Sequence, residues 1–212
     1  MPILAAKDAP FGDVERLGLA IHQTELGYHS GILYIENGQA RVLHLAFHHM
    51  LRDELASSPF RWTQISLDLD NKIVLAALVA RIANKHPAIP YAFNSDGVCF
   101  DKATGDLLQC PAGRGLTCAT FILAVFALFG HPILEGSTWE VRPEDVTWQQ
   151  AILAMLEGRS DPEHCEAVNA DRNAPRYRPD EVVGGATHDD WPVPFATALA
   201  LAEQIRADLA GS

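Results

Sequence analysis

The stretch HSGILYIENGQARVLHLAF constrains the fold of this chain more than any other part of the sequence. It contains two runs rich in β-branched and aromatic residues, 29–36 and 39–47, on either side of Asn37-Gly38. An Asn-Gly pair readily adopts the positive φ angles of a two-residue hairpin turn, and between two such runs it is a strong hairpin signal. The sequence therefore predicts an antiparallel β-hairpin that turns at Asn37-Gly38.

This hairpin brings two histidines together. A turn that pairs residue 36 with residue 39 puts His44 opposite Gly31 and His29 opposite Ala46. His29 and His44 are then diagonal neighbours on one face of the sheet, roughly 7 Å apart or less. Gly31 has no side chain, so we expect open space on that face beside His29. Two readings remain open: a functional pair, or two polar side chains satisfied by backbone groups.

The second constraining feature is GRGLTCATFILAVFALFG, residues 113–130, in which Cys118 opens an apolar helix that should stop at Gly130. Free cysteine is often buried as inert packing. However, the partial positive charge at a helix N-terminus favours a thiolate. At this position we expect the Cys118 pKa to lie below its usual value of about 8.5.

The loop before Cys118 supplies candidate hydrogen-bond donors. We expect Gly113, Gly115 and Thr117 to present backbone N–H groups where an oxyanion would bind. Tyr91, in IPYAF, is either a further donor at this place or an ordinary core aromatic.

The remaining pattern indicates a sheet early in the chain and helices late, and hence an α+β fold in a single domain spanning residues 1–212. Residues 158–192, rich in proline, glycine and aspartate, are expected to be irregular. The other expected elements are a strand at 17–22 (or a helix from Asp13), a strand at 63–69, a helix capped by Asp70 and ending at 85, and helices at 147–157 and 194–210.

Composition narrows the partners. The formal net charge of -11 argues against nucleic-acid backbones and anionic membrane surfaces, and the longest apolar run is too short to span a bilayer. The four cysteines have no CxxC spacing, and no signal peptide is visible, so we expect free thiols in the cytoplasm. The histidines His44, His48 and His49 lack an HExxH pattern, so neither a metal nor another cofactor is expected.

Four stretches together resemble a known family. They are YHSGILYI (28–35), VLHLA (42–46), PYAF (90–93) and LTCATFILAVF (116–126). In this order they resemble the circularly permuted NlpC-like, papain-fold cysteine peptidases, including the YiiX-like group. The resemblance covers about 17–130 and implies a circularly permuted papain-like fold, with an antiparallel sheet packed on a central cysteine-bearing helix. Residues 131–212 are then a helical and irregular extension packed on that core.

The resemblance also assigns roles to residues. It implies Cys118 as nucleophile, His29 as general base, His44 as the residue that orients His29, and Tyr91 as a substrate-binding residue near the oxyanion. Members of the family often carry an acidic residue at the position of His44. A histidine can orient another histidine through a ring nitrogen, although it stabilises an imidazolium less.

The expected activity is hydrolysis of an amide bond in a peptide, a peptidoglycan stem or an isopeptide, through an acyl-enzyme on Cys118. The substrate is then peptide-like or an acyl small molecule, and no cofactor is needed. Two alternatives stay open at this stage. One is a lipid acyltransferase or thioesterase that uses the same thiol, and the other is a catalytically silent binding module. The oligomeric state is not predicted.

Overall fold

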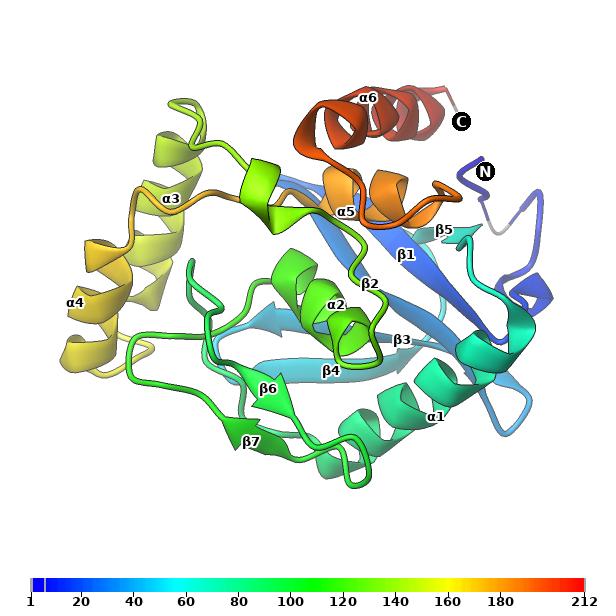
Figure 1. Cartoon of the computed structure of the whole chain (residues 1–212), viewed down its shortest axis with the longest axis horizontal. Coiled ribbons are helices and arrows are strands. Elements are labelled where there is room, and N and C mark those ends of the chain that lie inside the picture. The colour runs from blue at the N-terminus through cyan, green and yellow to red at the C-terminus, as the bar shows by residue number, and fades with distance from the viewer. Residues whose placement is uncertain (1, 6, 212) are drawn as a thin grey trace.

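A five-stranded antiparallel sheet forms the centre of the computed structural model, which describes residues 2–5 and 7–211 (Figure 1). The strand order is β4-β3-β2-β1-β5, and the sheet with its helices confirms a mixed α+β class. The strands are β1 (Leu17–Thr24), β2 (Gly27–Glu36), β3 (Gln39–Phe47), β4 (Met50–Leu55) and β5 (Arg61–Gln64).

The predicted hairpin is confirmed by β2 and β3. Their register pairs run from Glu36↔Gln39 at the turn to Ile32↔Leu43. Asn37 and Gly38 have φ angles of 50° and 76°, as a two-residue hairpin turn requires. The predicted strand at 17–22 is likewise confirmed by β1.

Helices cover one face of this sheet. Alternation along β1 points Leu17, Leu19 and Ile21 to that face, where they join the main hydrophobic core with α1, α2 and α5. Figure 1 shows α2 in front of the sheet and α6 on the outer side of α5. The helices are α1 (Leu69–Lys85), α2 (Cys118–Ala127), α3 (Asp145–Leu156), α4 (Pro162–Ala170), α5 (Pro179–Ala186) and α6 (Phe195–Ala210).

The opposite face of the sheet carries a smaller apolar cluster. It joins Leu33 and Val42 of the hairpin to Phe11 and Val14 of the N-terminal segment and to Trp62 of β5. The short 3-10 helix at Phe11–Asp13 supplies part of this cover. The sheet is therefore buried on both faces, although the second layer is thin.

The prediction of an irregular segment at 158–192 is wrong, because α4 and α5 lie within it. Both helices begin with a proline, Pro162 or Pro179, at a position where the missing N–H costs nothing. Gly184 lies inside α5, and a Cβ there would come within 2.9 Å of Leu201 on α6. Proline and glycine usually break helices, but here the two prolines begin α4 and α5, and Gly184 lets α5 pack closely against α6.

Two predicted boundaries also change. The residue that caps α1 is Asp68, whose side chain accepts a hydrogen bond from the Asn71 backbone, rather than Asp70. The strand expected at 63–69 is β5, which begins at Arg61 and ends at Gln64, so that the chain can turn into α1.

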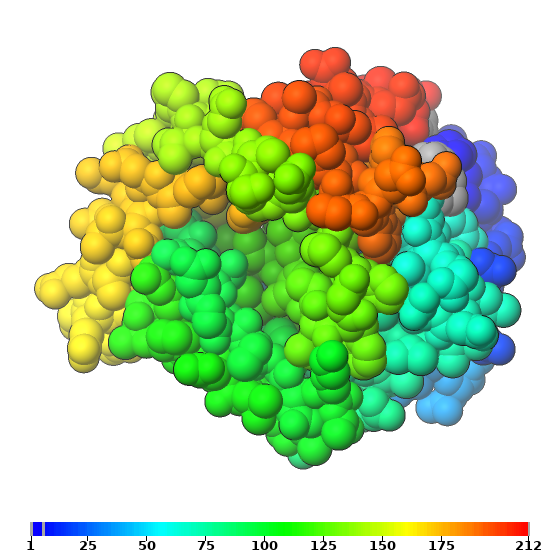
Figure 2. All heavy atoms as spheres, in the orientation of Figure 1, coloured from blue at the N-terminus to red at the C-terminus, as the bar shows by residue number. Residues whose placement is uncertain are grey.

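The segment between α1 and α2 contains a small antiparallel pair, β6 (Cys99–Phe100) and β7 (Leu107–Gln109). The space-filling view shows the surface hollowed over α2, between this segment and the chain that leads into α5 (Figure 2). Among the described residues, no helix combines the length and apolar character needed to cross a membrane.

Candidate functional site

Cys118 is the first residue of α2, and the helix start is fixed by its neighbours. Thr117 is the N-cap: its hydroxyl accepts a hydrogen bond from the Thr120 backbone, and the Thr120 hydroxyl accepts one from the Thr117 backbone. This capping box satisfies two donors of the first turn. Cys118 is buried, with 6% of its surface exposed, and it faces the sheet at the end of β2.

The sheet opens into a fork next to this thiol. Beyond Ile32↔Leu43, β2 continues in register with β1 only and β3 continues in register with β4 only. The two strands spread apart in Figure 1 toward their far ends. The expected pairing of His29 with Ala46 is therefore wrong, and instead both residues line a pocket together with Cys118.

Gly31 does not leave the open space that we expected. A Cβ at this position would lie 2.8 Å from the Cβ of His44 and 2.7 Å from Val42. Its missing side chain instead lets the two strands approach closely at His44, just before they separate.

His29 and His44 lie on one face, as the register predicted, and both rings contact Phe60 on the face that carries Leu33 and Val42, opposite the face that α2 covers. His29 Nε2 is 2.7 Å from His44 Nδ1, which is a hydrogen-bond distance between the two rings. His44 Nε2 is buried without a hydrogen-bond partner in the described structure, and Glu54 Oε1 lies 3.8 Å from it. The bond occupies Nε2 of His29 and leaves its Nδ1 for another partner.

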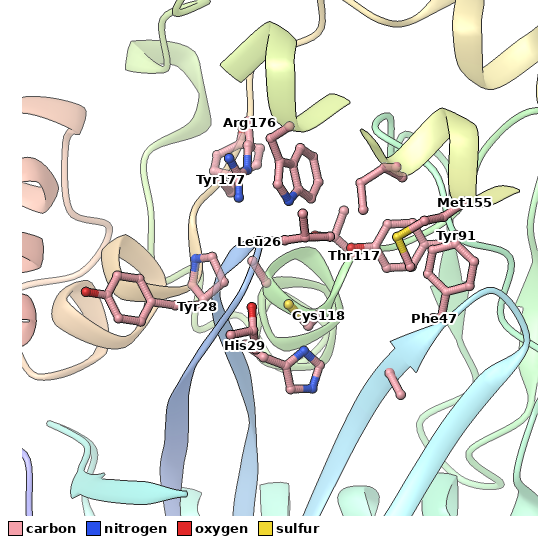
Figure 3. A pocket seen from close by; sticks show the side chains of 16 residues that line it. Leu26, Tyr28, His29, Phe47, Tyr91, Thr117, Cys118, Met155, Arg176 and Tyr177 are labelled. Atoms are coloured by element: carbon pink, nitrogen blue, oxygen red, sulfur yellow. The ribbon is translucent and has the colours of Figure 1, made fainter. Parts of the chain in front are cut away.

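The pocket at the fork has a volume of about 150 Å³. In the close-up, the thiol lies at the end of α2 with the His29 ring below it and Tyr91 to one side (Figure 3). The lining is largely apolar and aromatic, with a single arginine. The other side chains that line it include Leu26, Tyr28, Phe47, Thr117, Trp148, Ile152, Met155, Arg176 and Tyr177.

The structure contradicts the expected low pKa of the thiol. Burial raises the pKa of Cys118 above its ordinary value. The backbone and hydroxyl of Ser30, the positive charge of Arg176 and the Ala119 backbone each lower this pKa, but burial outweighs them. At neutral pH the site therefore holds a protonated thiol rather than a preformed thiolate.

Both imidazoles are held in the neutral form. Burial lowers the pKa of His29 to about 4, with the positive charge of Arg52 adding to the effect. Burial, followed by repulsion from His29, lowers the pKa of His44 to about 3. His29 and Cys118 line one pocket and are both neutral, so a proton would pass from the thiol to the imidazole only as the thiol attacks.

The oxyanion donors expected from the loop are mostly occupied. The Gly115 N–H binds the Asn94 carbonyl at 3.1 Å, and the Thr117 N–H binds the Thr120 hydroxyl at 2.7 Å. At the start of α2, the backbone N–H groups of Cys118 and Ala119 remain as donors. Tyr91 lines the pocket as predicted, and burial raises the pKa of its phenol well above 10.0, so it stays a hydrogen-bond donor.

Two histidines hold Tyr91 in place, and sequence reasoning gave them no such role. The Tyr91 N–H donates to His48 Nδ1 at 3.2 Å, and the Tyr91 carbonyl lies 3.0 Å from His164 Nε2. The two rings come from the β3–β4 turn and from α4 and lie 4.9 Å apart. Positions separated this far in sequence carry no local signal that would reveal the contact.

In the part of the chain that the structure describes, no group of three or more His, Cys, Asp or Glu side chains is placed to hold a metal ion. The four cysteines are free. No protein-family model, no curated protein and no solved structure matches this chain.

Proposed function

We propose that this protein is a cysteine hydrolase with a circularly permuted papain-like fold, which cleaves an amide bond through an acyl-enzyme on Cys118. The observation that carries the proposal is that His29, which lines the same pocket as the Cys118 thiol, is held by a 2.7 Å hydrogen bond to His44 outside that pocket. A thiol at a helix start, a base and a residue that orients the base are the components of such a site.

The His29–His44 bond determines which nitrogen can act as the base. If His29 donates its Nε2 proton to His44 Nδ1, then His29 Nδ1 is unprotonated and can accept a proton. His44 then carries its proton on Nε2, on the side of Glu54. No hydrogen bond joins the His29 ring to the Cys118 thiol in the described structure, and such bonds often tighten only when substrate binds.

The proposed reaction has two halves. As Cys118 Sγ attacks the carbonyl carbon, His29 Nδ1 takes the thiol proton and the carbonyl oxygen becomes an oxyanion. The Cys118 N–H and the Tyr91 hydroxyl are the proposed donors to that oxyanion. His29 gives its proton to the amine nitrogen as the C–N bond breaks. Water then attacks the thioester, its proton passes through His29 to the departing sulfur, and a carboxylic acid leaves.

The apolar lining supports a second candidate, in which the same thiol cleaves an acyl ester or thioester and transfers the acyl group. Phe47, Met155 and Ile152 give the pocket wall the character of an acyl-binding surface. The enclosed volume of about 150 Å³ favours a short acyl group over a long lipid chain.

The test is a set of substitutions assayed with 4-nitrophenyl acetate and with a panel of short peptide amides. Cys118→Ala and His29→Ala should each abolish acylation, and the double variant should be little worse than either, because the two residues act as one unit. His44→Ala should retain measurable activity, since water can partly orient His29. If neither histidine affects a reactive Cys118, the proposed mechanism is wrong.

A further inference from the structure

One cation lies in the wall of the Cys118 pocket. Arg176 comes from the segment between α4 and α5, and its guanidinium carbon stacks 3.7 Å from the centre of the Trp148 ring. Its side chain is only 13% exposed. Its charge lowers the pKa of both the Cys118 thiol and the Tyr91 phenol, so it acts on the groups that face the substrate.

The acidic partner of Arg176 is shared. Arg142 Nε binds one oxygen of the Asp145 carboxylate at 2.9 Å. The other oxygen lies 3.1 Å from Arg176 Nη1 and 2.9 Å from Arg178 Nη2. One buried carboxylate therefore serves three guanidinium groups.

The neighbouring carboxylates form ion pairs with other arginines. Glu181 pairs with Arg142, Asp180 pairs with Arg206, and Glu144 lies 3.4 Å from Arg178. None of these ion pairs includes Arg176, so Asp145, which Arg176 shares with Arg142 and Arg178, is its acidic partner in the described structure.

The donors of Arg176 are not all used in the hydrogen bonds described within the protein. A guanidinium has five N–H donors, and the side-chain hydrogen bond described for Arg176 uses Nη1. In the described structure, the fully buried side-chain atoms without a partner are Ser30 Oγ and His44 Nε2. The remaining nitrogens of Arg176 are therefore not fully buried, and the residue lines the Cys118 pocket and two neighbouring hollows. Burial lowers the pKa of Arg176, and Asp145 opposes this shift without cancelling it.

We propose that Arg176 is a carboxylate-binding residue, and that the substrate carries a free carboxylate close to the amide bond that Cys118 cleaves. This inference rests on the proposed function and narrows its substrate class. A planar guanidinium edge matches a carboxylate in geometry, and the Trp148 ring holds that plane in a fixed orientation. The same guanidinium edge also matches a phosphate, so the test compares a phosphonate with the carboxylate.

The test measures binding in the Cys118→Ala protein, where no turnover occurs. Isothermal titration calorimetry compares glutaramate with glutaramide, two compounds of the same shape of which only the first has a carboxylate. We expect glutaramate to bind about tenfold more tightly, as one charge-assisted hydrogen bond provides. Arg176→Gln should abolish this preference and Arg176→Lys should retain part of it. Arg159→Gln, which removes an exposed charge stacked near Phe47, is the matched control and should leave the preference unchanged.

Equal binding of the two compounds to the unsubstituted Arg176 site would overturn the proposal, whatever the variants do. A preference that survives Arg176→Gln in a folded protein, checked by circular dichroism, would also overturn it. Tighter binding of 4-phosphonobutanamide, which has the same chain length, than of glutaramate would refute the carboxylate assignment. Hydrolysis of 4-nitrophenyl acetate by the wild-type protein is measured separately, because its absence would refute the proposed function and leave the binding result readable.

Discussion

Acidification should destabilise this protein through His29 and His44. Both pKa values are lowered by burial, to about 4 and about 3, from an ordinary value of 6.5. Between pH 6.5 and about 4, these two histidines are therefore protonated in the unfolded chain but remain neutral in the folded chain. The stabilising contribution of the neutral pair is complete above pH 6.5, is lost progressively as the pH falls below 6.5, and levels off below the folded pKa values.

The magnitude follows from the two pKa shifts. At pH 5 the folded pair is still neutral, whereas each histidine in the unfolded chain is almost fully protonated. Each histidine then lowers the free energy of unfolding at pH 5 by about 2 kcal/mol relative to pH 7.5, and the pair lowers it by about 4 kcal/mol. Domains of this kind have a free energy of unfolding of about 5–15 kcal/mol, so the loss is a large fraction of the total.

The assay is urea denaturation at pH 7.5 and pH 5, on the wild-type protein and on the double variant His29→Gln, His44→Gln. The variant cannot titrate at these positions, so its loss between the two pH values should be smaller than the wild-type loss by about 4 kcal/mol. His86→Asn is the control, because His86 is exposed at the end of α1 with a positive φ that asparagine tolerates. An equal loss in wild type and double variant would refute the reasoning.

Three further substitutions test the scaffold by the same denaturation assay. Gly115→Ala should cost about 1–3 kcal/mol, because its Cβ would come within 2.3 Å of the Pro90 carbonyl, and it should slow alkylation of Cys118; unchanged stability would refute the close approach. Asp145→Asn should cost about 3–5 kcal/mol, because it removes the buried charge shared by the arginines; a loss below 1 kcal/mol would contradict that arrangement. Thr117→Ala should cost about 1 kcal/mol through loss of the helix cap, and a neutral result would mean that the cap contributes nothing.

Local features of the fold follow from sequence. The Asn37-Gly38 turn sets its own register, because hairpin pairing depends on the residues of the turn and their neighbours. The apolar helix beginning at Cys118 is marked by its cap and its composition. Counting residues outward from the turn also places His29 and His44 on one face, whereas their 2.7 Å contact forms beyond the last paired residues, Ile32↔Leu43.

Features that depend on tertiary packing do not follow from sequence. The separation of β2 and β3 beyond Ile32 reflects how each strand pairs with its outer neighbour, and no local pattern announces it. From sequence alone, the proline and glycines of α5 indicate a break in helical structure. Only the packing of Gly184 against Leu201 on α6 explains why glycine is used within this helix. Both features decide the shape of the pocket.

The electrostatic properties of the site likewise could not be predicted from the sequence. A helix N-terminus alone predicts a lowered thiol pKa, but the burial of Cys118 raises that pKa instead. In the sequence, Arg176 lies in a segment rich in charged residues. No local pattern indicates that its side chain lines a pocket formed mainly by residues before 120 and by α3. These facts require the coordinates of segments distant in sequence.

The central claim is that Cys118 is a nucleophile that depends on His29. The most direct test is to incubate the protein with 4-nitrophenyl acetate at pH 7, quench early, and locate the acetyl group by peptide mass spectrometry. The account predicts a thioester on Cys118, ahead of Cys99, Cys110 and Cys165, and its loss in a folded His29→Gln variant. Acetylation spread evenly over the four cysteines, or acetylation of Cys118 that persists in His29→Gln, would contradict it.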